Sequence, residues 1–235
     1  MIRRARTTVS RLVDAQHKEC AALLADIAAE AAATEGHTGR AAFSPEVMAA
    51  IARVPRERFV DRGHKLLAYV NGPLPIGYGQ TISQPYVVAL MTDLLELKPG
   101  HRVLEIGIGS GYQTAVLAEL GAEVFGLEIV PALARRSAER LQALGYRGLH
   151  LREGDGHAGW PEVAPFDRIL VAAAARTTPP ALIEQLLPGG RMVIPLGAGP
   201  MGQKLTLVVK NSDGAVREIN MLPVAFVPLT RRLAR

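Results

Sequence analysis

An apolar run leads directly into three closely spaced glycines in Val103-Leu104-Glu105-Ile106-Gly107-Ile108-Gly109-Ser110-Gly111. Glycine adopts backbone conformations that other residues avoid, and it lets another group approach the main chain closely. In open α/β sheets, a buried strand that ends in such a loop and continues into a helix commonly marks a ligand site. The run therefore predicts the first strand of a parallel sheet, with a binding site at its carboxyl end.

Short apolar strands and helical segments alternate after this point, which is typical of a parallel α/β sheet. A turn at Asn211-Ser212-Asp213-Gly214 then separates two further strands, which we expect to form an antiparallel hairpin. The sequence thus predicts an α/β, Rossmann-like sheet with a C-terminal antiparallel hairpin. The predicted strands are 102–106, 123–128, 149–152, 168–172, 191–195, 204–210 and 217–227, and the predicted helices are 112–120, 132–144 and 179–187.

The N-terminal region has a different composition. Residues 13–33 are rich in Ala, Leu and Glu and contain neither Pro nor Gly, which favours a helix. A polar break follows at Glu35-Gly36-His37-Thr38-Gly39. We therefore expect residues 1–40 to form an N-terminal helical arm and residues 41–235 to form the catalytic domain.

Composition narrows the classes of partner. The chain has 27 Lys and Arg against 22 Asp and Glu, a formal charge of +5, but its basic residues are scattered and only 5% of its residues are aromatic. Nucleic acid is therefore an unfavoured partner, since no stacking platform is evident. The single Cys20 and the dispersed histidines predict neither a disulfide framework nor a metal site. No apolar run is long enough to span a bilayer and no secretory signal is seen, so we expect a cytoplasmic monomer that does not bind membranes.

The glycine loop and its acidic neighbour indicate the class of cofactor. A dinucleotide site needs the spacing G-x-G-x-x-G, which places a pyrophosphate on a helix N-terminus. This loop instead has G-x-G-x-G, with Glu105 inside the end of the strand. An anion beside Glu105 is disfavoured, whereas S-adenosylmethionine carries a sulfonium and an amino group. The sequence therefore predicts S-adenosylmethionine as cofactor.

Two later strand ends carry acceptors that suit the same cofactor. Glu128 ends the second predicted strand and is placed to accept hydrogen bonds from both ribose hydroxyls, and Gly154-Asp155-Gly156 follows the third strand, where an adenine amine can be read. Ligands of open α/β sheets bind outside the carboxyl ends of the strands, so the three acceptors should converge. An ordinary strand-to-helix turn would explain the glycines alone, but not this convergence.

One loop resembles a known family. The run Pro73-Leu74-Pro75-Ile76-Gly77-Tyr78-Gly79-Gln80-Thr81-Ile82-Ser83-Gln84-Pro85 is similar to the loop that distinguishes protein-L-isoaspartate O-methyltransferases. The resemblance extends over about residues 42–230. It also rests on Val54-Pro55-Arg56-Glu57-Arg58-Phe59-Val60, Gly154-Asp155-Gly156, Ala164-Pro165-Phe166-Asp167, Leu187-Pro188-Gly189-Gly190-Arg191 and Phe226-Val227-Pro228-Leu229-Thr230.

The resemblance implies a class I S-adenosylmethionine-dependent methyltransferase sheet. It also implies methyl transfer to the free carboxylate of L-isoaspartyl and D-aspartyl residues in damaged proteins, which begins repair through a succinimide. By the same resemblance, Gln80 to Ser83 close over the cofactor, Ser83 is the catalytic residue that touches the substrate carboxylate, and the peptide backbone is held by Val227, Pro228 and Leu229. The expected cofactor contacts are Gln80, Thr81, Ile82, Ser83, Glu105, Gly107, Gly109, Ser110, Gly111, Glu128, Ile129, Asp155 and Gly156.

The chain departs from the family pattern at two places. It has Asn71 where the family commonly has Asp, and Ala172-Ala173-Ala174-Ala175-Arg176 after the fourth strand. These departures leave open a carboxyl methyltransferase redirected to an aspartate of a dedicated peptide, a nucleic-acid methyltransferase, or a binding scaffold without transfer activity. The second of these usually has Asp/Asn-Pro-Pro-aromatic after the fourth strand, which this chain lacks. Asn71-Gly72 is prone to deamidation if its loop is mobile, but should stay intact if the loop is rigid.

Overall fold

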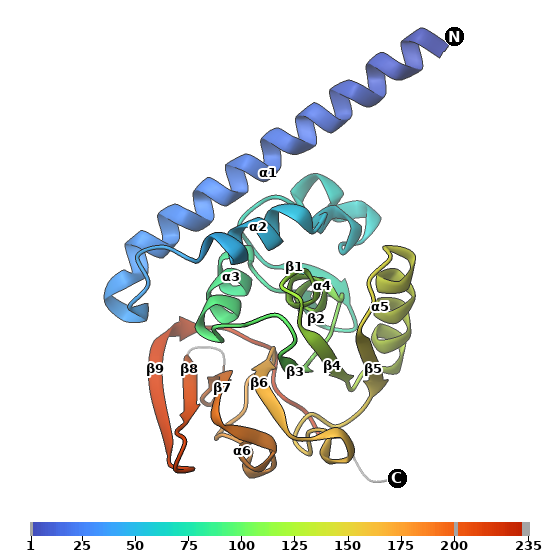
Figure 1. The fold of residues 1–235 in the computed structure, drawn as a ribbon. Coiled ribbons are helices and arrows are strands. Elements are labelled where there is room, and N and C mark those ends of the chain that lie inside the picture. The colour runs from blue at the N-terminus through green and yellow to red at the C-terminus, as the bar shows by residue number, and fades with distance from the viewer. Residues whose placement is uncertain (1, 200–201, 232–235) are drawn as a thin grey trace.

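A seven-stranded sheet forms the centre of the computed structural model, which describes residues 2–199 and 202–231. The strand order is β5-β4-β3-β6-β7-β8-β9 (Figure 1). The first five strands in this order, from β5 through β4, β3 and β6 to β7, are parallel to one another. Strand β8 is antiparallel to both of its neighbours, β7 and β9. The predicted fold class is confirmed. The strands are β3 (Arg102–Ile106), β4 (Glu123–Glu128), β5 (Leu149–Glu153), β6 (Phe166–Val171), β7 (Leu186–Leu196), β8 (Gln203–Lys210) and β9 (Val216–Val224).

Strand β3 lies between β4 and β6. The chain that follows β3 first builds β4 and β5 on one side of it, and then returns to build β6 and β7 on the other side. Such a switch point opens a crevice above the strand ends. A separate two-stranded sheet, β1 (Leu74–Gly77) and β2 (Gln80–Ile82), lies near this edge. The helices are α1 (Ile2–Thr38), α2 (Pro45–Arg53), α3 (Pro85–Leu94), α4 (Tyr112–Glu119), α5 (Pro131–Ala143) and α6 (Pro180–Gln185), with short 3-10 turns η1 (Arg56–Arg58), η2 (Arg62–Leu67) and η3 (Pro161–Val163).

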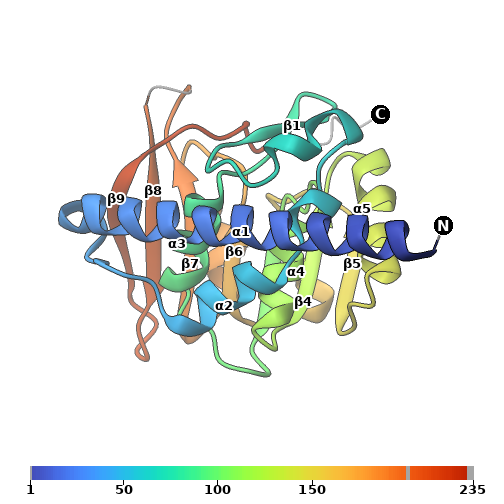
Figure 2. The same ribbon diagram turned by 90° about the horizontal axis from the view of Figure 1, so that it is seen from above.

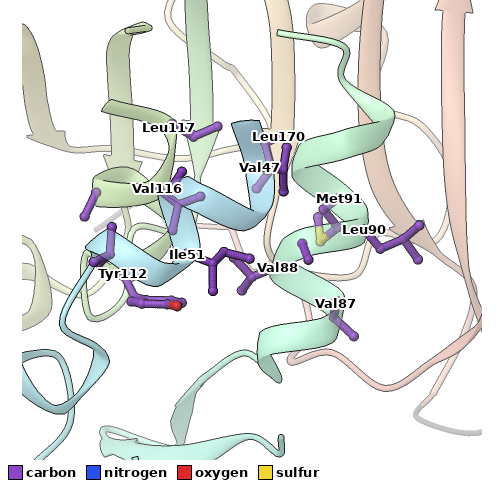
Figure 3. Packing of buried hydrophobic residues seen from close by; sticks show 14 of the residues in the cluster. Val47, Ile51, Val87, Val88, Leu90, Met91, Tyr112, Val116, Leu117 and Leu170 are labelled. Carbon is purple, nitrogen blue, oxygen red and sulfur yellow. The ribbon is translucent and has the colours of Figure 1, made fainter. Parts of the chain in front are cut away.

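The two faces of the sheet bury separate hydrophobic clusters, because side chains alternate between faces along a strand. On β3, Val103 belongs to the cluster that also contains residues of α1 to α5, whereas Leu104 and Ile106 belong to the cluster beside α6. Figure 3 shows the first cluster where α2, α3 and α4 meet. All ten residues of α3 are buried, so this helix is a central packing element.

Helix α1 is longer than predicted, because it continues on both sides of residues 13–33 and passes through Gly36. A single helical glycine costs only about 1 kcal/mol relative to alanine, which tertiary contacts can offset. These contacts come from Leu23, Ile27 and Ala31, which are spaced four residues apart and are fully buried. The N-terminal part of α1 extends beyond the rest of the fold (Figures 1 and 2). No helix among the described residues is long and apolar enough to cross a membrane.

The predicted helix 179–187 is wrong at its C-terminal end. Helix α6 stops at Gln185, and β7 begins at Leu186, five residues before the predicted strand. Leu186 pairs with Phe166 of β6, and Lys210 Nζ donates to Leu186 O at 2.8 Å. These contacts with distant residues take the place of helical hydrogen bonds, because Pro188 has no backbone N–H to continue the helix. The other predicted boundaries of strands and helices from residue 102 onward differ from the observed ones by three residues or fewer.

Candidate functional site

A cavity opens at the carboxyl ends of β3, β4 and β6, where the topology predicts a crevice. Its walls come from β2 and Ser83, the glycine loop after β3, the end of β4, the segments directly after β5, β6 and β9, and residues of α3 and α4. Its lining residues are Gln80, Thr81, Ile82, Ser83, Val88, Ile106, Gly107, Ile108, Gly109, Ser110, Tyr112, Gln113, Leu127, Glu128, Ile129, Val130, Gly154, Gly156, Ala172, Ala173, Val227, Pro228, Leu229 and Thr230.

Glu128 holds the glycine loop in shape. Its Oε2 atom accepts a hydrogen bond from the Gly109 backbone N–H at 2.8 Å, and its Oε1 accepts one from the Val130 N–H at 2.9 Å. Each carboxylate oxygen has about two acceptor positions, so further acceptor capacity remains beside the cavity. On the outer side, Arg140 Nη1 donates to Ser110 O at 2.6 Å. The loop is therefore fixed from two sides before any ligand binds.

The two-stranded sheet of β1 and β2 packs against the glycine loop. A Cβ atom added to Gly109 would lie 3.3 Å from Ile76 Cδ1, which shows how closely β1 approaches. The fully buried Arg56 fixes the segments on either side of this small sheet. It donates from Nη2 to Ser83 O at 2.7 Å and to Gly72 O at 3.3 Å. Its guanidinium also lies over the Tyr112 ring, 4.7 Å from the centroid. Arg56 thus ties the position of Ser83 to the first residue of α4.

Burial changes the pKa values of Arg56 and Tyr112. It lowers the pKa of Arg56, although Tyr112 partly opposes the shift. It also raises the pKa of Tyr112 to about 12. The phenol therefore stays neutral under physiological conditions, and the contact between the two side chains is a cation–π interaction rather than an ion pair.

The segment after β9 is fixed by backbone pairing. Ala174 N donates to Val227 O at 2.8 Å, and Leu229 N donates to Ala174 O at 2.8 Å. One residue upstream, the Gln203 side chain bonds both Phe226 N and Phe226 O, at 2.6 and 3.1 Å. The alanine run after β6 is therefore the partner of the segment that forms the last wall of the cavity.

Thirteen of the predicted site residues line this cavity. They come from parts of the chain that are far apart in the sequence, and the fold brings them together at one edge of the sheet. Their individual roles stay predictions. The residues are Gln80, Thr81, Ile82, Ser83, Gly107, Gly109, Ser110, Glu128, Ile129, Gly156, Val227, Pro228 and Leu229.

Three predicted cofactor contacts are not among the residues that line it. Glu105 is fully buried on the opposite face of β3 from Ile106, as the alternation of strand side chains requires. Gly111 is the N-cap of α4 and has a φ of 87°, and a Cβ there would lie 3.0 Å from Leu141 Cδ1, so it faces α5. Asp155 accepts hydrogen bonds from the N–H and the ring of His157 within its own loop.

The environment of Glu105 makes it a neutral acid at neutral pH. Burial raises its pKa to about 8; the Thr114 hydroxyl opposes this shift, and the nearby Glu128 carboxylate adds to it. A protonated carboxyl beneath the glycine loop presents no negative charge to a cationic cofactor. In the folded protein at neutral pH, Glu105 therefore gives little repulsion of anions at this site.

Sequence reasoning did not identify several residues of the site. Val88 belongs to α3, and Tyr112 and Gln113 belong to the start of α4. Their apolar or helix-forming character indicated packing, and no local pattern marks which turn of a helix faces a cavity. Arg56 carried no signal of its own, because Glu57 and Arg58 beside it make the segment look like an ordinary charged turn. Within the described residues, no group of three His, Cys, Asp or Glu is arranged to hold a metal ion.

Comparison with known sequences identifies the family. A profile of the protein-L-isoaspartate(D-aspartate) O-methyltransferase family matches residues 31–234. Protein-L-isoaspartate O-methyltransferase 2 of Polaromonas sp. is 54% identical over 208 residues, which cover 88% of this chain and 99% of the relative. Protein-L-isoaspartate O-methyltransferase of Anaeromyxobacter dehalogenans is 57% identical over 202 residues, which cover 86% of this chain and 96% of the relative.

Solved structures agree with this assignment. A protein-L-isoaspartate O-methyltransferase matches with a TM-score of 0.75 and 28% identity, over 80% of this chain and 62% of that chain, so this chain spans less than two thirds of its length. A Plasmodium falciparum protein described as a beta-aspartate methyltransferase, in complex with S-adenosyl-L-homocysteine, matches with a TM-score of 0.73 and 25% identity, over 90% of this chain and 98% of that chain. The chain belongs to the protein-L-isoaspartate(D-aspartate) O-methyltransferase family.

Proposed function

We propose that this protein transfers the methyl group of S-adenosylmethionine to the free carboxylate of L-isoaspartyl residues, and of D-aspartyl residues, in damaged proteins. The observation that carries the proposal is the cavity itself. One continuous space joins the glycine loop and Glu128 to Ser83 and to the segment Val227–Leu229. A cofactor bound at the glycine loop and Glu128 would meet, inside this space, a peptide bound at Ser83 and Val227–Leu229.

The lining of the cavity fits a cationic cofactor. Among the lining residues that the structure describes, Glu128 is the one with a charge, and there is no Lys, Arg or His. A cofactor with phosphates would find no cation there, whereas a sulfonium and ribose hydroxyls suit a carboxylate with spare acceptor positions. The related Plasmodium falciparum structure was solved with S-adenosyl-L-homocysteine. Glu128 would hold the ribose, and the glycine loop would hold the amino-acid part.

The chemistry needs positioning rather than a base. When bound, S-adenosylmethionine supplies an electrophilic methyl group on its sulfonium. An acceptor carboxylate has a pKa near 4 in solution and is already ionised, so no side chain has to remove a proton. Ser83 would donate its hydroxyl hydrogen to one carboxylate oxygen and leave the other free to attack in line. Residues Gln80 to Ser83 would exclude water from the reacting pair. The backbone nitrogen then attacks the ester carbonyl and methanol leaves, which gives a succinimide whose hydrolysis returns part of the material to normal aspartate.

We further propose that the protein acts as a cytoplasmic monomer and does not methylate nucleic acid. The cavity has all of its walls within one chain, which supports action as a monomer. The free thiol of Cys20 suits a reducing compartment. The cavity has no cationic side chain for a phosphate backbone, and Ala173 to Arg176 lack the usual pattern of base methylases.

The decisive experiment compares acceptors. Purified protein is incubated with methyl-labelled S-adenosylmethionine and with an isoaspartyl peptide, its aspartyl twin, tRNA or DNA. We expect label in the isoaspartyl peptide alone, as a base-labile ester. Equal labelling of the aspartyl twin would indicate a redirected carboxyl methyltransferase, and labelling of tRNA or DNA would overturn the proposal.

The role of Ser83 is tested in the same assay. Ser83→Ala should lower kcat with the isoaspartyl peptide by about ten- to a thousandfold, a range taken from the loss of one orienting hydrogen bond at a reacting centre. Binding of S-adenosylhomocysteine should change little, because the hydroxyl is assigned to the acceptor. If cofactor affinity collapses while kcat at saturation survives, Ser83 belongs to the cofactor site instead.

A further inference from the structure

A second pocket continues from the cofactor cavity on the acceptor side. The two share Thr81, Ser83, Ala172 and Val227, so Ser83 stands at their junction. The second pocket is bounded by α1, the start of α3 and the end of β9. Its lining residues are Glu30, Pro73, Thr81, Ser83, Gln84, Tyr86, Val87, Ala172, Leu222, Pro223, Val224, Ala225, Phe226 and Val227.

Glu30 is the one charged side chain among these lining residues. The helix that carries it is firmly placed, because Ile27 and Ala31 are fully buried. The Thr34 hydroxyl also bonds the Tyr86 hydroxyl at 2.6 Å. The position of the carboxylate is therefore set by the core of the protein and does not depend on a bound ligand.

The carboxylate is held by neutral donors. Oε2 accepts from Asn71 Nδ2 at 2.8 Å and from Gln84 Nε2 at 3.0 Å, while Oε1 accepts from Gln84 Nε2 at 3.2 Å. Amide donors orient a carboxylate without cancelling its charge. No salt bridge to Glu30 is found in the described part of the chain. A fixed negative charge therefore faces a pocket with largely apolar walls, where screening by water is reduced.

The Glu30 carboxylate and Ser83 line the same pocket and are linked through Gln84. Gln84 follows Ser83 in the chain and touches Glu30 with its side chain. An extended peptide advances about 3.3 Å per residue. A side chain one or two residues from the reacting carboxylate can therefore reach Glu30 if it is long.

We propose that this second pocket is the subsite for a residue that flanks the isoaspartate, and that Glu30 selects a Lys or Arg side chain there. This inference rests on the proposed function, since it assumes that the acceptor is a peptide held beside Ser83. The apolar walls would contact the methylene stem of the side chain, and the carboxylate would pair with its charged end. The substrate class favoured by this chain is thus isoaspartate in a locally basic sequence.

The test uses isoaspartyl peptides that differ at one flanking position, which carries Lys, its neutral analogue norleucine, or Glu. The position is scanned one and two residues on each side. At one of these positions we expect kcat/KM of the Lys peptide to exceed that of the norleucine peptide by about five- to twentyfold, as for a partly buried charge-assisted hydrogen bond, mainly through KM. The Glu peptide should be the poorest of the three, and added salt should shrink the ratio.

Two variants assign the preference to Glu30. Glu30→Gln keeps the shape and one acceptor oxygen but removes the charge, and should bring the Lys to norleucine ratio close to one. Glu35→Gln makes the same change at an exposed position of the same helix that does not line the pocket, and should leave the ratio as in the wild type. Thermal melting checks that both variants fold.

The outcomes separate this inference from the proposed function. If the norleucine peptide is methylated but no flanking charge matters in the wild type, the function stands and the Glu30 inference fails. If the ratio survives Glu30→Gln, another group selects the charge and the inference also fails. If no isoaspartyl peptide is methylated, both fall. If Glu30→Gln does not fold, the wild type still tests the inference. Lys, norleucine and Glu peptides must then rank in that order, with a ratio that shrinks as salt is added, and any other order overturns the inference.

Discussion

At the scale of single residues, Glu128 combines two tasks, because its carboxylate accepts two backbone N–H groups and lines the cofactor cavity. Glu128→Gln should weaken binding of S-adenosylhomocysteine by about 1 to 3 kcal/mol, since an amide replaces a charged acceptor and turns a donor toward one N–H. Calorimetry measures this directly. Glu139→Gln, an exposed change on α5, serves as the control. Unchanged affinity in the Glu128 variant would remove this residue from the site.

Glu105 predicts an unusual dependence of stability on pH. Burial raises its pKa from 4.5 to about 8 in the folded protein, whereas the unfolded chain keeps a value near the ordinary one. Between these two pKa values the folded state binds the extra proton, so the contribution of Glu105 to stability is greatest below pH 4.5 and falls as pH rises toward 8. Glu105→Gln removes this loss. The variant should therefore gain about 3 kcal/mol relative to the wild type between pH 4 and pH 7.

Urea unfolding at pH 4, 5, 6, 7 and 8 measures this difference. The comparison uses the change with pH and not the absolute stability, because a buried amide has a desolvation cost of its own at every pH. Parallel pH profiles for the wild type and Glu105→Gln would show that the Glu105 carboxyl ionises normally in the folded protein.

At the scale of loops and helices, Asn71-Gly72 lies in a rigid connection. Asn71 donates from Nδ2 to Glu30 and accepts at Oδ1 from Tyr86 N at 3.0 Å, while Gly72 N donates to Val70 O at 2.8 Å. Ring closure to a succinimide requires Gly72 N to reach the Asn71 side chain, and both groups are already engaged. These contacts favour the rigid alternative over self-deamidation.

We therefore expect Asn71 to survive prolonged incubation at mildly alkaline pH. Asn211 provides an internal comparison, since it is exposed in the turn between β8 and β9. Peptide mapping should show deamidation at Asn211 before any at Asn71. Deamidated Asn71 beside intact Asn211 would mean that the loop opens in solution.

Local sequence was sufficient for most elements of the sheet, but not for elements whose limits depend on distant partners. The strand β3 and its loop carry a strong local pattern, and so does the hairpin β8–β9. The early start of β7 depends instead on pairing of Leu186 with Phe166. The extent of α1 depends on packing against α3 and β9, which no local signal encodes.

The candidate site shows the same division. Backbone loops with glycine were predicted from their spacing, and they do line the cavity. Side-chain directions were harder to predict: Glu105 and Asp155 were expected to contact the cofactor, but neither is among the residues that line the cavity, and their roles stay predictions. The support by Arg56 joins two segments that only the fold brings together.

At the scale of the whole molecule, the division of the chain at residue 40 stays a prediction, and the contacts of α1 favour a division further upstream. Removal of residues 1–16 should leave a chain that melts cooperatively. Removal of residues 1–38 should abolish cooperative melting or lower stability by several kcal/mol, because it strips Leu23 and Ile27 from the core, and one such side chain contributes about 2 to 5 kcal/mol. Thermal unfolding followed by circular dichroism compares the two, and an intact transition in the shorter chain would support a separate arm.

The last wall of the cavity has a consequence for biosynthesis. Val227–Thr230 closes a site whose other walls come from residues 80–173. A chain emerges from the ribosome N-terminus first, so strands β3 to β7 can pair while this wall has yet to be made. A nascent polypeptide with a nearly complete sheet would then bind no acceptor peptide. If Val227–Leu229 hold the acceptor peptide as proposed, a copy becomes competent only when residue 230 has been made and has folded into place.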